Sequence, residues 1–192
     1  MPHALITGAS SGIGAALALE LARRGWDVSL IARRREKLEA VAASVVEAGA
    51  RAALAVADVT DRKGVREAIA SCTAELGPVD LAIANAGGGG LTPADAFDAG
   101  EASRIMRLNF DGVAHTLECV LPEMIARGKG HVAAMASIAG LAGLPPSSVY
   151  SASKAAVLRI LRRRSYTARA DVVVRGDNCG AGRTGARYAG IS

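Results

Sequence analysis

Tyr150 and Lys154 are the residues whose types and spacing best suit acid–base chemistry. They stand in the segment Tyr-Ser-Ala-Ser-Lys, and four positions place them one turn apart on the same face of a helix. A neighbouring ammonium stabilises a phenolate and lowers the pKa of a tyrosine, so the phenol can exchange protons near neutral pH. The alternative is a solvated helix face, where this pair is common. The surrounding elements must decide between the two.

A glycine-rich turn near the N-terminus suits the binding of a phosphate. Residues 3–7 predict a strand, the segment Thr7–Gly14 (TGASSGIG) follows, and the apolar pattern of residues 15–24 predicts a helix. Such a turn points backbone N–H groups and a helix N-terminus at a phosphate, and its glycines permit positive φ and close approach. The alternative is a turn whose glycines serve packing alone. The strand before it and the helix after it favour the phosphate.

Three consecutive arginines follow the second predicted strand, residues 27–32. In a doubly wound sheet this is where the adenosine ribose is recognised. An acidic residue there would bind a 2′-hydroxyl, whereas Arg33 suits a 2′-phosphate, so NADP is favoured over NAD. Alternatively, the arginines are the solvated start of the helix predicted for residues 36–48. One phosphate cannot take all three, and Arg33 is the predicted ligand.

Strands and helices alternate along the rest of the chain, which predicts a parallel sheet with helices on both faces. The further expected strands are residues 52–57, 79–84 and 131–135, and the further expected helices are residues 61–76, one or two within 102–127, and one carrying Tyr150 and Lys154. Asp58 and Asn85 follow two of these strands, Ser137 lies just past a third, and Asn109 falls inside a helical stretch. The fold class is therefore a single α/β domain with a doubly wound, Rossmann-like parallel sheet.

Composition and charge exclude other classes. The 192 residues are 51% hydrophobic, which suits one domain with a substantial core. The net charge is +5, yet residues 1–158 carry 15 Lys or Arg and 16 Asp or Glu, so the basic excess belongs to residues 159–192. That tail could bind a nucleic-acid backbone. It lacks interleaved aromatic residues, so no nucleic-acid partner is expected.

The chain is expected to work in the cytoplasm without a metal. It shows neither a secretory signal nor an apolar run long enough to span a membrane. Cys72, Cys119 and Cys179 are odd in number and lack metal-ligand spacing. They are interpreted as free or buried thiols in a reducing compartment.

Taken jointly, these motifs and their order resemble the classical short-chain dehydrogenase/reductase family over about residues 3–158. The motifs are the turn Thr7–Gly14, Asp58-Val59, Asn85-Ala86-Gly87, Asn109, Ser137, and Tyr150 with Lys154. The resemblance implies a nicotinamide dinucleotide cofactor. Its implied contacts, with Arg33 included, are Gly8, Ser11, Gly12, Ile13, Gly14, Arg33, Asp58, Val59, Asn85, Tyr150 and Lys154.

The resemblance also implies hydride transfer between NADP(H) and a ketone or secondary alcohol. Tyr150 would be the general acid and base, while Lys154 would lower its pKa and bind the nicotinamide ribose. Ser137 would hydrogen-bond the substrate oxygen, and Asn109, at a helix kink, would hold a water of a proton relay. The alternatives are structural: a strand-end cap for Ser137 and a buried, backbone-bonded amide for Asn109.

Beyond Leu158 the sequence departs from the family, so we expect a domain of residues 1–158 and an aberrant basic tail of residues 159–192. Residues 171–174 could form a short strand, while residues 176–192 lack apolar periodicity and are expected to be disordered. One hypothesis is a frame shift, in which residues 176–182 would encode the family's sixth strand and Pro-Gly turn in another frame. Whatever the cause of the departure, the sheet is expected to be incomplete at its C-terminal strands.

This departure leaves a second functional interpretation open: a truncated or frame-shifted product with at most weak nucleotide binding. The resemblance implies homo-oligomers that assemble through the helices of Asn109 and Tyr150. Because the sequence changes soon after Tyr150, oligomer formation is not assured here. For the active oxidoreductase, the expected substrate is a small-molecule carbonyl or alcohol.

Overall fold

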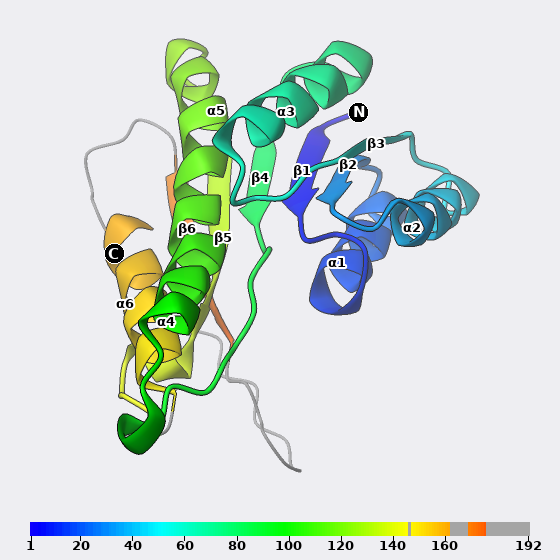
Figure 1. Ribbon diagram of the computed structural model, residues 1–192. Helices are drawn as coiled ribbons and strands as arrows, with labels where there is room; N and C mark the ends of the chain where they lie inside the picture. The colour runs from blue at the N-terminus through cyan, green and yellow to red at the C-terminus, as the bar shows by residue number, and fades with distance from the viewer. Residues whose placement is uncertain (146, 162–168, 176–192) are drawn as a thin grey trace.

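A single twisted sheet of parallel strands organises the chain in this computed structural model, which describes residues 1–145, 147–161 and 169–175 (Figure 1). The strand order is β3-β2-β1-β4-β5-β6. The strands are β1 His3–Thr7, β2 Asp27–Ala32, β3 Ala52–Val56, β4 Leu81–Ala84, β5 His131–Ser137 and β6 Arg169–Arg175. The sequence jump between the neighbours β1 and β4 is the point where a doubly wound sheet opens a crevice at its carboxyl edge.

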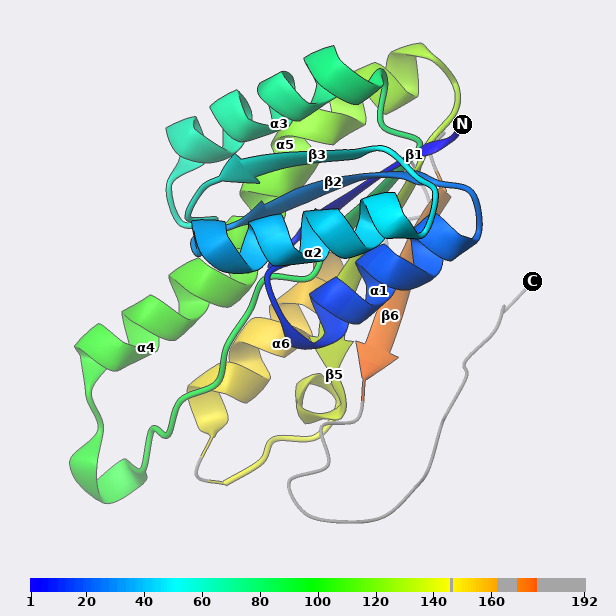
Figure 2. The ribbon, with the colours of Figure 1, turned by 90° about the vertical axis from the view of Figure 1, so that its right-hand side faces the viewer.

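Helices connect the strands and cover both faces of the sheet. They are α1 Gly12–Arg23, α2 Arg35–Glu47, α3 Arg62–Leu76, α4 Ala99–Met106, α5 Gly112–Ala126 and α6 Ser148–Leu161, with short turns at Ala94–Ala96 and Ile138–Gly140. Figure 2 shows α1 and α2 on one face and α3 with α5 on the other. The predicted doubly wound α/β fold is confirmed.

Two apolar clusters fill the space between the sheet and these helices. One packs Val65, Leu117 and Val157 of α3, α5 and α6 against one face of the sheet. The other packs Ala18 and Leu38 of α1 and α2 against the opposite face. Both faces of the central strands are buried, which is why every residue of β1 and β2 is buried and their apolar residues do not alternate with exposed polar ones.

The helical stretch around Asn109 is two helices joined by one wide turn. A π-helical segment, Arg107–Asp111, links α4 to α5. Such single-turn bulges insert an extra residue into an α-helix and re-aim the side chains within it. Asn109, the residue expected at a helix kink, lies within this π-helical turn and is fully buried.

The end of the described chain adds a sixth strand to the sheet. β6 pairs in parallel with β5 from His131↔Arg169 to Ser137↔Arg175, so the strand expected at residues 171–174 is present and longer. Ser137 is the last residue of β5 and does not lie past its end. α6 continues to Leu161, beyond the expected boundary at residue 158. The expected disorder of residues 176–192, and the segment 176–182 of the frame-shift hypothesis, lie outside the described residues.

Buried polar side chains fix the amino ends of β1 and β2. His3 Nδ1 lies 2.8 Å from the carbonyl of Gly77 and Nε2 lies 2.7 Å from Ser29 Oγ, with His3 only 1% exposed. Because a carbonyl only accepts, Nδ1 carries the proton and Nε2 accepts from the serine. Desolvation of this ring lowers the pKa of His3. The fully buried Asp27 accepts from Arg51 Nη2 at 2.6 Å.

Over the described part of the chain, no helix is both long and apolar enough to cross a membrane. The same residues contain no cluster of His, Cys, Asp or Glu that could hold a metal ion.

Candidate active site

The glycine-rich turn after β1 is tightly packed against the end of β4. Gly8 has a φ of +69°, and a Cβ there would lie 2.7 Å from the Cα of Ala86. A Cβ on Gly14 would collide with the carbonyl oxygen of Gly8 and would lie 2.7 Å from Asn85 Nδ2. Gly12 has a φ of +57° with open space around it, so its glycine serves backbone conformation and leaves the helix N-terminus uncovered.

Thr7 and Asn85 hold the two strand ends together. The hydroxyl of Thr7 accepts from the backbone N–H groups of Asn85 at 3.1 Å and Ala86 at 3.2 Å. In return, Asn85 Nδ2 donates to the carbonyls of Thr7 at 3.1 Å and Gly8 at 3.3 Å. Asn85 therefore supports the glycine-rich turn at the edge of the crevice. The sequence predicts this residue as a cofactor contact.

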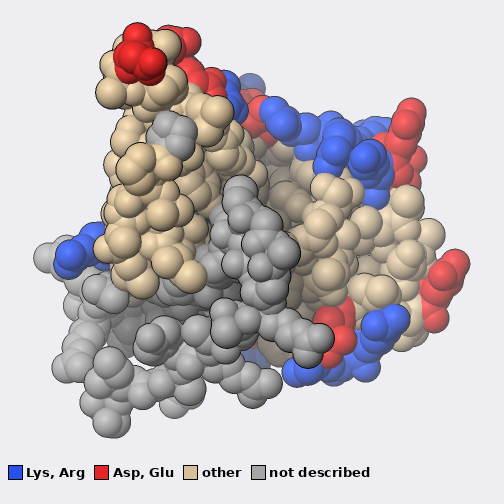
Figure 3. All heavy atoms as spheres, turned by 90° about the horizontal axis from the view of Figure 1, so that it is seen from below, with Lys and Arg blue, Asp and Glu red and all other residues tan. Residues whose placement is uncertain are grey.

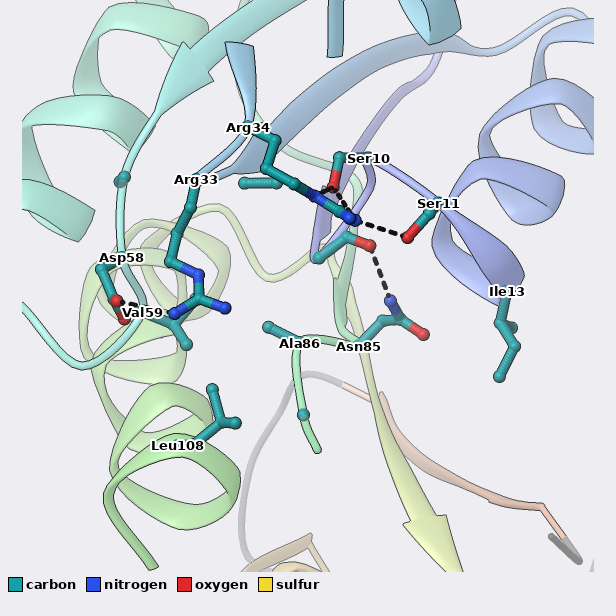
Figure 4. A pocket seen from close by; sticks show the side chains of 14 residues that line it. Ser10, Ser11, Ile13, Arg33, Arg34, Asp58, Val59, Asn85, Ala86 and Leu108 are labelled. Atoms are coloured by element: carbon teal, nitrogen blue, oxygen red, sulfur yellow. Dashed lines mark hydrogen bonds and ion pairs between the residues drawn. The ribbon is translucent and has the colours of Figure 1, made fainter. Parts of the chain in front are cut away.

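A cleft of about 400 Å³ opens along this edge of the sheet (Figure 4). Its lining includes most of the predicted cofactor residues: Gly8, Ser11, Ile13, Arg33, Asp58, Val59 and Asn85. A second hollow of about 490 Å³ beside α4 shares Arg33, Asp58 and Leu108 with it. Figure 3 looks onto the carboxyl edge of the sheet and shows Lys and Arg side chains gathered on one side of a hollow, opposite a largely uncharged wall.

The arginines after β2 divide between the two sides of this cleft. Arg34 Nη2 donates to Ser10 Oγ at 2.9 Å and to Ser11 Oγ at 2.7 Å, so its guanidinium lies over the glycine-rich turn. Arg33 points to the other side, where Nη1 lies 3.5 Å from Asp58 Oδ2, and its side chain is 70% exposed. Figure 4 shows the two side chains diverging. The sequence predicts Arg33 as a phosphate ligand but indicates neither Arg34 nor Ser10 as a cofactor contact. A run of three arginines does not indicate which of them faces the turn.

The cleft fits a phosphate-bearing ligand. Ser11 occupies the N-cap position of α1 but makes no side-chain cap hydrogen bond, so its hydroxyl is left for Arg34 and the helix terminus remains available to an anion. The missing side chains of the glycines leave room beside that terminus. Guanidinium, hydroxyl and backbone N–H groups are the donors that a pyrophosphate or 2′-phosphate requires.

Asp58 and Val59 form the far wall of the cleft. Asp58 Oδ1 accepts from the backbone N–H of Thr60 at 2.9 Å and from its hydroxyl at 2.8 Å. Partial burial alone would raise the pKa of Asp58, but these bonds and Arg33 together lower it. Val59 lines the cleft beside Asp58 although it is only 4% exposed, so an apolar side chain lies next to the carboxylate.

Asn109 bonds to the loop after β4 and to the helix of Tyr150. Its Oδ1 accepts from the N–H of Gly88 at 2.9 Å, and its Nδ2 donates to the carbonyl of Gly88 at 2.9 Å and to Ser153 Oγ at 3.0 Å. A Cβ on Gly87 would lie 2.8 Å from Asn109 Oδ1 and 3.2 Å from Lys154 Nζ. The structure thus brings Asn109 and Lys154 to the same glycine.

Tyr150 and Lys154 lie one turn apart on α6, as the sequence predicts. Lys154 is 4% exposed; its Nζ donates to the carbonyl of Met135 at 2.8 Å and lies 5.8 Å from the centroid of the Tyr150 ring. A buried amine beside a phenol is unlike the solvated helix face of the alternative interpretation. Ser137 ends the same strand as Met135, is 2% exposed, and its Oγ accepts from the N–H of Ala139 at 3.2 Å.

The segment after Ser137 packs directly on this helix. A Cβ on Gly140 would lie 2.7 Å from the carbonyl carbon of Lys154. Leu144 N donates to Ser151 Oγ at 3.1 Å, and Thr92 Oγ1 lies 3.1 Å from Ser148 Oγ. The two loops at this end of the sheet are therefore tied to the helix that carries Tyr150.

This sheet, with helices on both faces and a cleft at its carboxyl edge, defines a Rossmann-like α/β protein, and comparison with known proteins identifies its family. The profile of the family described as short chain dehydrogenase matches residues 2–187. The chain belongs to the short-chain dehydrogenase family. The match extends past Leu158, the expected end of the resemblance.

Known relatives are oxidoreductases and include proteins with either form of the cofactor. An uncharacterized oxidoreductase of Myxococcus xanthus is 43% identical over 152 residues, which cover 79% of this chain and 60% of the relative. NAD⁺-bound xylitol dehydrogenase is 32% identical with a TM-score of 0.87, covering 91% of this chain and 70% of that one. An alcohol dehydrogenase of Thermococcus sibiricus, complexed with 5-hydroxy-NADP, is 29% identical with a TM-score of 0.87, covering 92% and 76%.

The chain spans less than two thirds of the length of the curated relatives it matches, as the Myxococcus protein illustrates at 60%.

Proposed function

We propose that the chain is an NADP-preferring oxidoreductase that transfers a hydride between the cofactor and a ketone or secondary alcohol. The observation that carries this is the buried Lys154 ammonium beside the Tyr150 ring, at the edge of the sheet where the phosphate-binding turn also lies. A bound nicotinamide would supply or accept the hydride. The partner is a small molecule, and no nucleic-acid partner, membrane or metal is proposed; the compartment proposed is the cytoplasm.

In this proposal Tyr150 moves the proton that accompanies the hydride. During reduction its phenol donates to the carbonyl oxygen, and during oxidation its phenolate accepts from the alcohol. The ammonium of Lys154 stabilises the phenolate in both directions. Met135 holds that ammonium through its carbonyl, which orients it without neutralising it.

Two further residues would position the substrate oxygen and the proton path. Ser137 would donate to the substrate oxygen from the end of β5. Asn109 donates both of its amide hydrogens, to Gly88 and Ser153, and accepts from Gly88. Its side chain thus fixes the loop, and we propose that a water is held through its backbone. The structural alternative for Asn109 accounts for the same bonds, and the two roles are compatible.

The preference for NADP rests on the two arginines. Arg34, with Ser10 and Ser11, presents donors beside the turn, and Arg33 can leave its long, exposed contact with Asp58 at little cost. The residues directly after β2 are Arg33, Arg34 and Arg35, so no acidic side chain stands there to bind a 2′-hydroxyl.

The direct test is oxidation of NADPH by the purified chain over a panel of ketones, with Tyr150→Phe as the matched variant. We expect Tyr150→Phe to lower kcat by about 10²- to 10⁴-fold while NADPH, followed by its fluorescence, still binds. Full activity in the phenylalanine variant would contradict the proposed role of Tyr150.

The competing proposal is an inactive product that binds nucleotide weakly. It is motivated by the sequence after Leu158, where the motifs of the resemblance end. It predicts a thermal shift with NADPH but no turnover on any carbonyl. An absence of binding to both NADPH and NADH at high concentration would count against both proposals.

A further inference from the structure

The turn Asp58–Thr60 forms one wall of the cleft, and most of its hydrogen bonds join residues that are two or three positions apart. The carboxylate of Asp58 accepts twice from Thr60, and the carbonyl of Asp58 accepts from the N–H of Asp61 at 3.0 Å. The carbonyl of Val59 is different. It lies 2.8 Å from Nδ1 of His115, a residue of α5 that is 56 positions further along the chain.

The direction of this bond is fixed by chemistry. A carbonyl oxygen only accepts, so Nδ1 of His115 must carry the hydrogen. The bond to Val59 therefore depends on the hydrogen at Nδ1 of His115.

A second contact fixes the same residue from the same helix. A Cβ on Gly112, one turn before His115, would lie 2.7 Å from Cγ2 of Val59. The absence of a side chain at Gly112 lets the turn lie directly on α5, so the turn cannot shift inward. The imidazole of His115 holds its carbonyl, so it does not shift outward.

We infer that His115 is a positioning residue for the adenosine end of the dinucleotide. It sets the place of Val59, and through Val59 the hydrophobic wall and the neighbouring Asp58 carboxylate that line the cleft. This inference rests on the proposed function. The Asp58–Thr60 side of the cleft faces adenosine only if a dinucleotide binds there, with its adenosine ribose beside Arg33. No sequence motif indicated it, and His115 itself is not among the residues that line the cleft.

The test compares two variants of matched shape. Asn places an amide nitrogen close to the position of His Nδ1 and keeps the donor, whereas Leu has nearly the same shape without one. We expect His115→Leu to weaken ADP-ribose binding about tenfold, as measured by isothermal titration calorimetry. His115→Asn should restore affinity to within about twofold of the unaltered chain.

Cys119→Ala serves as the control, because Cys119 is also half-buried on α5, one turn beyond His115. It should leave ADP-ribose affinity unchanged. The melting temperatures of the ligand-free asparagine and leucine variants are measured alongside, because a purely structural role would move stability and not affinity. Should the leucine variant fail to fold, His115→Ala provides the same comparison.

A folded leucine or alanine variant with unaltered affinity would overturn the inference, as would an asparagine variant that is as weak as the leucine variant. Failure of the unaltered chain to bind either ADP-ribose or NADPH would instead refute the proposed dinucleotide site, and this inference with it.

Discussion

At the scale of single residues, the site depends on which side chain of a similar set faces the cleft. Arg33, Arg34 and Arg35 are adjacent in sequence but have three environments: the carboxylate of Asp58, the serines of the turn, and Glu39 on α2. Only the first two line the cleft. The choice of Arg33 as phosphate ligand therefore stays a prediction, now with Arg34 beside it.

Replacement of these arginines tests cofactor choice. Arg34→Leu should weaken NADPH binding by about 10- to 100-fold and NADH binding far less, because the lost charge-assisted hydrogen bonds go to the 2′-phosphate. Arg33→Leu should act in the same direction. Arg35→Leu removes only an exposed i, i+4 pair with Glu39 and should leave both affinities unchanged. Equal losses for NADPH and NADH would argue against 2′-phosphate recognition.

At the scale of elements, the strand–turn–helix unit at the N-terminus works because its glycines are required for different reasons. Gly8 and Gly14 bring the turn against the end of β4, whereas Gly12 supplies a positive φ. The tie between Thr7 and Asn85 depends on that close approach. The two halves of the sheet therefore meet at one packed junction.

Enlarging the junction by one methyl group should break it. Gly14→Ala would press a Cβ into the carbonyl of Gly8 and the amide of Asn85, so we expect a loss of about 1–3 kcal/mol of stability and loss of nucleotide binding. Gly143→Ala, where a Cβ would meet open space, is the control and should be close to neutral in urea unfolding and in binding. A neutral Gly14→Ala variant would contradict this account.

At the scale of the whole molecule, buried polar groups link stability to pH. His3 has a lowered pKa in the folded chain, so protons bind the unfolded chain first. Burial opposes ionisation of Asp27, but the bonds from Arg51 prevail and lower its pKa. Both groups thus stabilise the fold above their unfolded pKa values and lose that contribution as pH falls.

Urea unfolding across pH should reveal two stages. Stability should decline first as pH falls below about 6.5, where unfolded histidine protonates, and again below about 4, where unfolded aspartate does. Asp27→Asn should cost about 1–2 kcal/mol at pH 7 and should flatten the lower stage. An unchanged free energy of unfolding between pH 7.5 and pH 5.5 would show that His3 does not couple to folding.

The sequence by itself determined the fold class, because alternating strand and helix patterns with glycine turns allow few arrangements other than a parallel sheet. It also determined the residues that end the strands at one edge, since parallel strands bring their carboxyl ends together. Asp58, Asn85 and Ser137 lie where that rule places them, and Tyr150 with Lys154 lies on one helical face as the spacing requires. Their catalytic and binding roles stay predictions.

The tertiary structure alone decided the contacts between elements. Three contacts illustrate this: Arg34, unlike Arg33, bonds to the glycine-rich turn, His115 bonds to Val59, and Lys154 is buried against Met135. Each contact joins segments whose separation in sequence carries no periodic signal. The residue types permit many such pairs, and only the packing of α5 and α6 on the sheet selects among them. The spacing of Tyr150 and Lys154 is common in helices. The burial of Lys154 distinguishes this pair, and a sequence pattern does not specify burial.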